Sequence, residues 1–203
     1  MNLKPYYLYM AVLAAFNLLI LSTPFIMVAD YSAGETLHGA FSLTCHQLVA
    51  RSYCYYPEED AIADCPPIYS KEMVLETERG PAYKFPVCAR DLPLYLAALI
   101  GGIVVYFTKW RDSTKTPNPI YFVVALIPIA FDGGTQFLGL RESSNELRAL
   151  TGIIAGFAFS FYIIPMLNFF FLRDRTNPKT EDSGYQSLEE QKKEKKGENK
   201  KSI

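Results

Sequence analysis

The chain has 203 residues, half of them hydrophobic, and a formal net charge of −1. This near-neutral charge gives no bulk basic surface, so we expect no nucleic-acid partner. The apolar residues are gathered in long runs, which is typical of an integral membrane protein and excludes a water-soluble protein built around one large core.

Four apolar stretches approach the length needed to cross a bilayer. They cover residues 5–29, 92–108, 120–140 and 149–172. About 20 helical residues cross roughly 30 Å of hydrocarbon. We therefore predict an all-α integral membrane protein with about four transmembrane helices, in one membrane domain over residues 1–172. The first stretch is too long for a cleaved signal peptide, so we expect a retained helix.

Positive charges predict the orientation of these helices. Lys109, Arg111 and Lys115 lie between the second and third spans, and Arg173 follows the fourth. Short segments rich in Lys and Arg favour the cytoplasm. Both termini are then cytoplasmic in a multi-pass protein of the cell membrane, in contact with membrane lipids. Residues 30–91 form an extracytoplasmic loop between the first and second spans.

The loop and the C-terminal segment differ in character. Residues 173–203 are rich in Lys, Glu and Gln and cannot bury enough apolar surface to offset ordering entropy, so we predict a disordered, charged cytoplasmic tail. In the loop, residues 38–56 show apolar spacing that favours an amphipathic helix, and residues 68–83 indicate a short hairpin.

An acidic residue interrupts the third span. Asp132 and Gln136 are four residues apart and share one helical face. An acid inside a membrane costs on the order of a few kcal/mol, so it needs a partner or a water-filled cavity. One interpretation makes Asp132 a ligand or general base. The other is a buried ion pair with a nearby arginine: Arg90, Arg141 or Arg148.

The predicted topology brings metal-ligand types to the same end of the bundle. Cys45 and His46 lie within the outer loop, and Cys88 and Asp91 lie at its end. Thiolate, imidazole and carboxylate are the usual ligands of zinc. We therefore predict that these four residues are candidate ligands of zinc or another divalent metal. Adjacent Cys45 and His46 point in different directions on a helix, so we do not expect both to bind one ion.

Several polar residues near this end can hold a substrate. The candidate substrate-binding residues are Gln47, Arg51, Arg90, Gln136, Arg141, Asn145 and Arg148. Arginine binds carboxylates and phosphates through paired hydrogen bonds. With Asp132 and His46 as candidate catalytic groups, the set predicts a site that binds or acts on the head group of a lipid or amphiphile. Anchoring at the interface is the alternative for Arg141 and Arg148, and an ion pair with the acids at 58–60 is the alternative for Arg51.

The four cysteines all fall in the predicted outer loop, where conditions are oxidising. We predict a structural disulfide between Cys54 and Cys65. For Cys45 and Cys88, metal ligation, a structural disulfide and redox exchange all remain open.

Together these motifs resemble a family of small bacterial and archaeal membrane proteins known as domain of unknown function 2085. The resemblance rests on Cys45-His46-Gln47, on Phe-Pro-Val-Cys-Ala-Arg at 85–90, and on Asp-Gly-x-x-Gln-x-x-Gly-x-Arg from residue 132 onward. The family pattern usually has a second Cys where Asp91 stands here. This change can preserve metal binding, but it removes a Cys-x-x-Cys disulfide. The resemblance implies no particular reaction.

Two other functions remain open. The chain can be a quinone-linked thiol-disulfide oxidoreductase, since an exported cysteine loop on four helices suits that chemistry. It can also be an accessory structural subunit that binds partner membrane subunits, with a polar cluster that only ties helices and loop together. The residues alone do not decide whether the protein is an enzyme.

Overall fold

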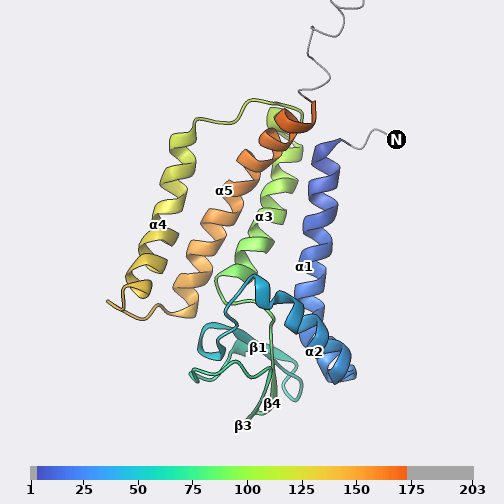
Figure 1. The fold of residues 1–203 in the computed structure, drawn as a ribbon, viewed down its shortest axis with the longest axis vertical. Coiled ribbons are helices and arrows are strands. Elements are labelled where there is room, and N and C mark those ends of the chain that lie inside the picture. The colour runs from blue at the N-terminus through green and yellow to red at the C-terminus, as the bar shows by residue number, and fades with distance from the viewer. Residues whose placement is uncertain (1–3, 173–203) are drawn as a thin grey trace, which may run out of the picture.

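The computed structural model describes residues 4–172, so the predicted tail at 173–203 lies outside the described residues. Helices account for most of this part of the chain. They are α1 (Pro5–Ala29), α2 (Tyr31–Ala40), α3 (Asp91–Tyr106), α4 (Pro119–Phe137) and α5 (Asn145–Leu172). The four long helices run side by side, and a small sheet lies at one end of them beside α2 (Figure 1).

Three of the helices are long and apolar enough to cross a membrane. These are α1, α4 and α5, whereas α3 is apolar but has only 16 residues. Many of their large hydrophobic side chains are exposed in the described residues, as expected for surfaces that face lipid.

Helices α3 and α5 approach each other closely through glycines. A Cβ atom on Gly152 would collide with the carbonyl oxygen of Arg90, and one on Gly156 would collide with that of Leu94. Small residues four apart let two helix backbones come into contact. This contact fixes the beginning of α3, where the functional candidates lie, against α5.

A four-stranded antiparallel sheet replaces helix in part of the loop, so the all-α prediction is wrong there. The strands are β1 (Tyr53–Tyr56), β2 (Ala61–Asp64), β3 (Val74–Thr77) and β4 (Gly80–Lys84), in the order β2-β1-β4-β3. A disulfide joins Cys54 to Cys65, as the sequence indicates, and both lie in the small core beneath the sheet.

The helix predicted over residues 38–56 is also wrong. Helix α2 ends at Ala40, short 3-10 turns follow at Phe41–Leu43 and Val49–Arg51, and Tyr53 already belongs to β1. Between the two turns Gln47 adopts a positive φ of 55°, which breaks helical geometry. The predicted hairpin is confirmed by the antiparallel pairing of β3 with β4.

An apolar cluster fixes the sheet to the helices. Ile20 of α1, Phe41, and Phe85 and Val87 after β4 are buried together with Leu92 of α3. Burying each of these large side chains contributes about 1.5–3 kcal/mol. The segments around residues 45 and 88 are thus held against the start of α3.

Candidate functional site

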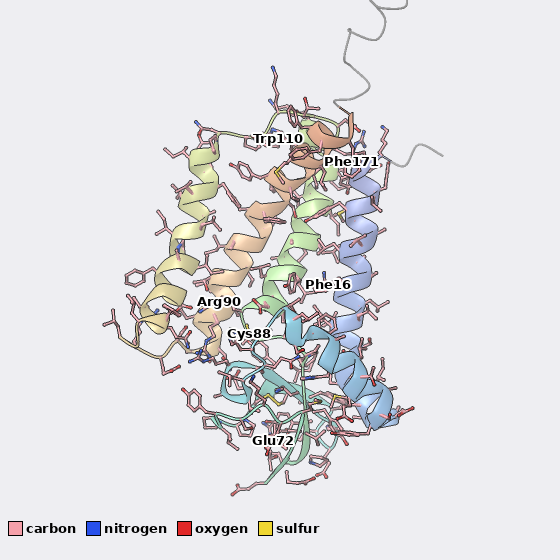
Figure 2. All side chains as sticks on the ribbon, viewed as in Figure 1. Phe16, Glu72, Cys88, Arg90, Trp110 and Phe171 are labelled. Carbon is pink, nitrogen blue, oxygen red and sulfur yellow. A yellow bond between two sulfur atoms is a disulfide. The ribbon has the colours of Figure 1, made fainter. Side chains whose placement is uncertain are left out.

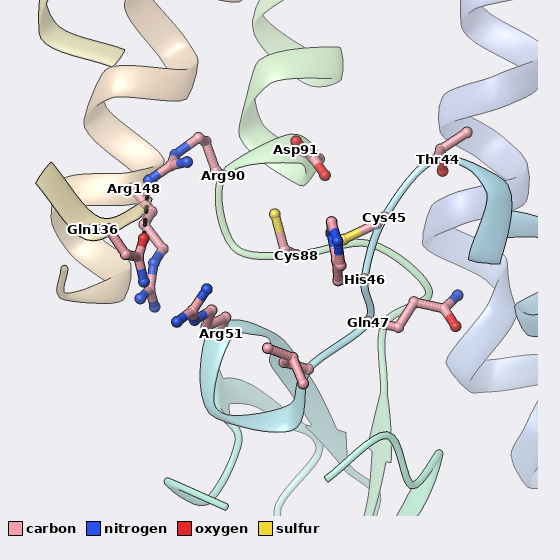
Figure 3. A pocket seen from close by; sticks show the side chains of 11 residues that line it. Thr44, Cys45, His46, Gln47, Arg51, Cys88, Arg90, Asp91, Gln136 and Arg148 are labelled. Carbon is pink, nitrogen blue, oxygen red and sulfur yellow. Dashed lines mark hydrogen bonds between the residues drawn. The ribbon is translucent and has the colours of Figure 1, made fainter. Parts of the chain in front are cut away.

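Three potential metal ligands meet where the helices join the sheet. The sulfur atoms of Cys45 and Cys88 and a carboxylate oxygen of Asp91 all lie within 4.8 Å of one another. The two sulfurs and the carboxylate face a common space (Figure 3), at the bundle end that also carries Arg90 (Figure 2). Ligand atoms around one tetrahedral zinc are roughly 3–4 Å apart, so a small closure of this group would enclose an ion. We call these three residues the ligand group.

Hydrogen bonds from one side chain to two backbone carbonyls help to bring the two cysteines together from distant segments. Gln47 is buried, and its amide nitrogen donates hydrogen bonds to the carbonyls of His38 at 2.8 Å and Pro86 at 2.9 Å. This side chain connects the segment that carries Cys45 to the segment just before Cys88. Gln47, a candidate substrate-binding residue from the sequence, lines the site, but these two hydrogen bonds make it a positioning residue.

The two thiols are free, so the structural-disulfide alternative for them is not realised. Hydrogen bonding from the Cys88 thiol lowers the pKa of Cys45. The same hydrogen bond, with burial and the nearby Asp91 charge, raises the pKa of Cys88. Without an ion, Cys45 is the more acidic thiol and Cys88 keeps its proton. A divalent cation binds thiolates and would displace that proton.

A cavity of about 210 Å³ adjoins the ligand group. Most of the predicted substrate-binding residues line it: Gln47, Arg51, Arg90, Gln136 and Arg148. Arg141 and Asn145 do not. The arginines gather on the wall opposite Asp91 (Figure 3). One wall of the cavity therefore carries metal-ligand types, and the other carries positive charge.

His46 also lines the cavity, but it does not belong to the ligand group. The predicted four-residue metal set therefore reduces to three residues. Both Cys45 and His46 line the cavity, but only Cys45 places its ligand atom within 4.8 Å of those of both Cys88 and Asp91. His46 and Cys45 also both border a second hollow of about 380 Å³, together with Lys71.

Asp132 lies outside the cavity, with 2 % of its side chain exposed. It accepts hydrogen bonds from Arg90 at 2.5 Å and from Arg141 at 2.7 Å. This arrangement favours the ion-pair interpretation over a general base. Through Arg90, Asp132 helps to shape the cavity wall that it does not itself touch.

Sequence reasoning missed Glu142 and Asp64, which organise the remaining polar residues. Glu142 accepts hydrogen bonds from Arg51, Arg148 and Gln136 at 3.1–3.4 Å. Arg51 thus pairs with Glu142, whereas the predicted partner acids at 58–60 lie elsewhere. The only sequence signal for Glu142 was its place directly after Arg141, the last residue of the motif that begins at Asp132.

Asn145 connects the helices to the sheet. It donates to Asp64 of β2 at 2.9 Å and accepts from Arg148 at 2.7 Å. Its side chain is therefore occupied within the protein, which argues for a structural role. Arg148, by contrast, both donates to Asn145 and lines the cavity.

Comparison with known proteins gives a family and two relatives. Residues 81–162 match the family described as "Predicted membrane protein (DUF2085)". An uncharacterized protein of Methanocaldococcus jannaschii is 39 % identical over 176 residues, covering 81 % of this chain and 94 % of the relative. An uncharacterized protein of Methanothermobacter thermautotrophicus is 36 % identical over 72 residues, which are 36 % of this chain and 63 % of that protein. No solved structure gives a significant match.

Proposed function

We propose that this chain, which belongs to the DUF2085 family of predicted membrane proteins, binds zinc or a similar divalent ion beside a pocket for the polar head of a lipid or amphiphile. The observation that carries this proposal is the approach of three ligand atoms, from Cys45, Cys88 and Asp91, to within 4.8 Å of one another. Two thiolates with one carboxylate suit zinc. Three protein ligands leave a fourth position for water or substrate.

The membrane arrangement in this proposal has four spans. Helix α3, with 16 residues, extends about 24 Å and packs along α5, which supports counting it with the three longer helices. Lys109, Arg111 and Lys115 then lie in the cytoplasm with both termini. The ligand group and the sheet lie at the opposite, outer face of the cell membrane, at the depth of lipid head groups.

Asp91 favours metal binding over thiol chemistry. A bare carboxylate near two sulfurs opposes ionisation of the thiols and contributes to the raised pKa of Cys88. A cation reverses this effect, because the carboxylate then becomes a third ligand. Asp91 thus hinders redox chemistry at the two cysteines but contributes a ligand to a metal site.

A thiol-disulfide oxidoreductase is the second candidate function. The two free sulfurs of Cys45 and Cys88 lie close together in the ligand group. Forming a disulfide between them would release two electrons and two protons, which a membrane quinone can accept.

Elemental analysis of the full-length protein in detergent tests the proposal. About one zinc or similar ion per chain is expected in the native protein. Asp91→Asn and Cys88→Ser should lose most of it, because each removes a ligand. Glu72→Gln is the matched control, since Glu72 is exposed in the segment before β3, outside the ligand group (Figure 2), and should leave the metal content unchanged.

Thiol counting on the same samples separates the two candidates. Metal in the native protein together with two free thiols would support the metal site. The absence of metal from native protein, even after incubation with zinc, would overturn it. A Cys45–Cys88 disulfide in that metal-free protein, reduced and reformed with a quinone, would establish the second candidate.

A further inference from the structure

Three arginines from separate elements meet at the cavity. Arg51 belongs to the short turn before β1, Arg90 directly precedes α3, and Arg148 lies in the first turns of α5. Figure 3 shows them on one side of the cavity, across from Asp91. Gathering three like charges is costly unless anions compensate them.

The acids available within this part of the structure only partly compensate the charge. Asp132 is shared by Arg90 and Arg141, and Glu142 is shared by Arg51 and Arg148. Four arginines thus share two carboxylates, which leaves two positive charges unmatched. A divalent ion held by two thiolates and Asp91 would contribute one negative charge, so the site as a whole would stay positive.

Unused hydrogen-bond donors lie on the same residues. Among the described residues, the buried Nε atoms of Arg51 and Arg90 have no hydrogen-bond partner. A buried donor without a partner is costly, so the protein itself only partly satisfies the guanidinium groups of Arg51 and Arg90. Rotation of these two side chains toward an anion with several oxygens in the cavity would satisfy both donors.

We propose that this pocket binds a phosphate group, supplied by the head of an anionic amphiphile or by free inorganic phosphate. A tetrahedral phosphate offers oxygens to several arginines at once, whereas one arginine already satisfies a carboxylate. The 210 Å³ cavity is smaller than pockets that enclose whole drug-sized ligands, so it fits a head group whose apolar part remains outside. This inference rests on the proposed head-group pocket and names its ligand class.

Calorimetric titration of the full-length protein in detergent tests this proposal. The probes are inorganic phosphate, dihexanoyl phosphatidic acid and, as a carboxylate control, hexanoate. We expect the phosphate probes to bind and hexanoate to bind at least tenfold more weakly. Arg51→Gln should weaken phosphate binding roughly tenfold to a hundredfold, because it removes charged hydrogen bonds.

Arg79→Gln is the matched control. Arg79 also pairs with a glutamate, Glu59, but it lies in the turn between β3 and β4, outside the cavity. Tighter binding of phosphatidic acid than of phosphate would identify a lipid source, and equal binding would identify free phosphate. Equal losses in Arg51→Gln and Arg79→Gln, equal affinity for hexanoate, or no binding of either phosphate probe would overturn the proposal.

Metal content measured on the same samples keeps this test separate from the metal proposal. Arg51→Gln should retain its metal, because Arg51 is outside the ligand group. Arginine-dependent phosphate binding by a protein without metal would support the phosphate pocket and overturn the metal-site proposal. Retained metal with no phosphate binding would support the metal site and overturn the phosphate pocket.

Discussion

Arg90 and Asp132 join the start of α3 to α4 through an ion pair of 2.5 Å between Nη2 and Oδ2. Asp132 is the only buried residue of α4, whose remaining side chains are exposed or half-buried. The position of α4 at this end therefore depends strongly on one polar contact. The same contact directs Arg90 toward the cavity.

Replacing Asp132 with Asn should destabilise the protein by about 3 kcal/mol, because Arg90 and Arg141 then lose the carboxylate that they share. The free energy of unfolding in detergent, followed by circular dichroism, measures this loss. Asp112→Asn is the control: Asp112 also pairs with an arginine but is 49 % exposed, so less than about 1 kcal/mol is expected. Equal losses would contradict the role assigned to the Arg90–Asp132 pair.

The contact between α3 and α5 gives a second prediction. Gly156→Ala should cost about 1–3 kcal/mol, because the added methyl group meets the carbonyl of Leu94 and forces the helices apart. Gly134→Ala in α4 is the matched change, since a Cβ there has open space. It should be neutral or stabilise by up to about 1 kcal/mol. Similar unfolding midpoints for the two variants would refute the close packing.

The four long helices could be predicted from sequence because each is a long apolar run. Helix α2 could not, because its ten residues are mostly small or polar. Strands β3 and β4 could be predicted as a hairpin, but β1 and β2 could not, because each has only four residues, too few to distinguish alternation from helical spacing. The segment Tyr53–Tyr56 alternates half-buried and buried side chains, yet its aromatic residues also fit an amphipathic helix. Its pairing with β2 and β4 decides the matter, and pairing is a long-range property.

Topology alone predicted that Cys45, Cys88 and Asp91 would meet, since all three fall at one end of the bundle. It did not decide which of the adjacent residues Cys45 and His46 would face this group. In the structure Cys45 belongs to the ligand group and His46 does not. Glu142 enters the network because the turn between α4 and α5 reaches Arg51, a contact across 91 residues of sequence.

The thiol pair gives a third prediction, on metal-free, reduced protein. Cys45 should react with iodoacetamide before Cys88, because the hydrogen bond between them lowers the pKa of Cys45 and raises that of Cys88. Mass spectrometry of partially alkylated protein at pH 7 gives the order. Cys88→Ala should slow alkylation of Cys45 several-fold, whereas Cys88→Ser keeps a donor and should slow it less. Faster modification of Cys88 would contradict this ordering.

His38 gives a prediction on pH. Its side chain is fully buried in α2, and burial, aided by the positive charge of Lys84, lowers the pKa of His38 to about 4. In the unfolded chain a histidine has a pKa of about 6.5. Between pH 6.5 and pH 4 the unfolded chain therefore binds a proton that the folded protein does not, so stability should fall as the pH falls through this window.

The loss attributable to His38 amounts to at most about 3 kcal/mol at pH 4. Unfolding free energies measured from pH 4 to pH 7 in detergent should show a steeper slope for the native protein than for His38→Gln, whose side chain does not titrate. Carboxylates also titrate in this range, so the slope that remains in the variant measures their share, and the difference between the curves measures His38. Parallel curves would mean that His38 gains its proton as readily in the folded protein as in the unfolded chain, which its burial beside Lys84 argues against.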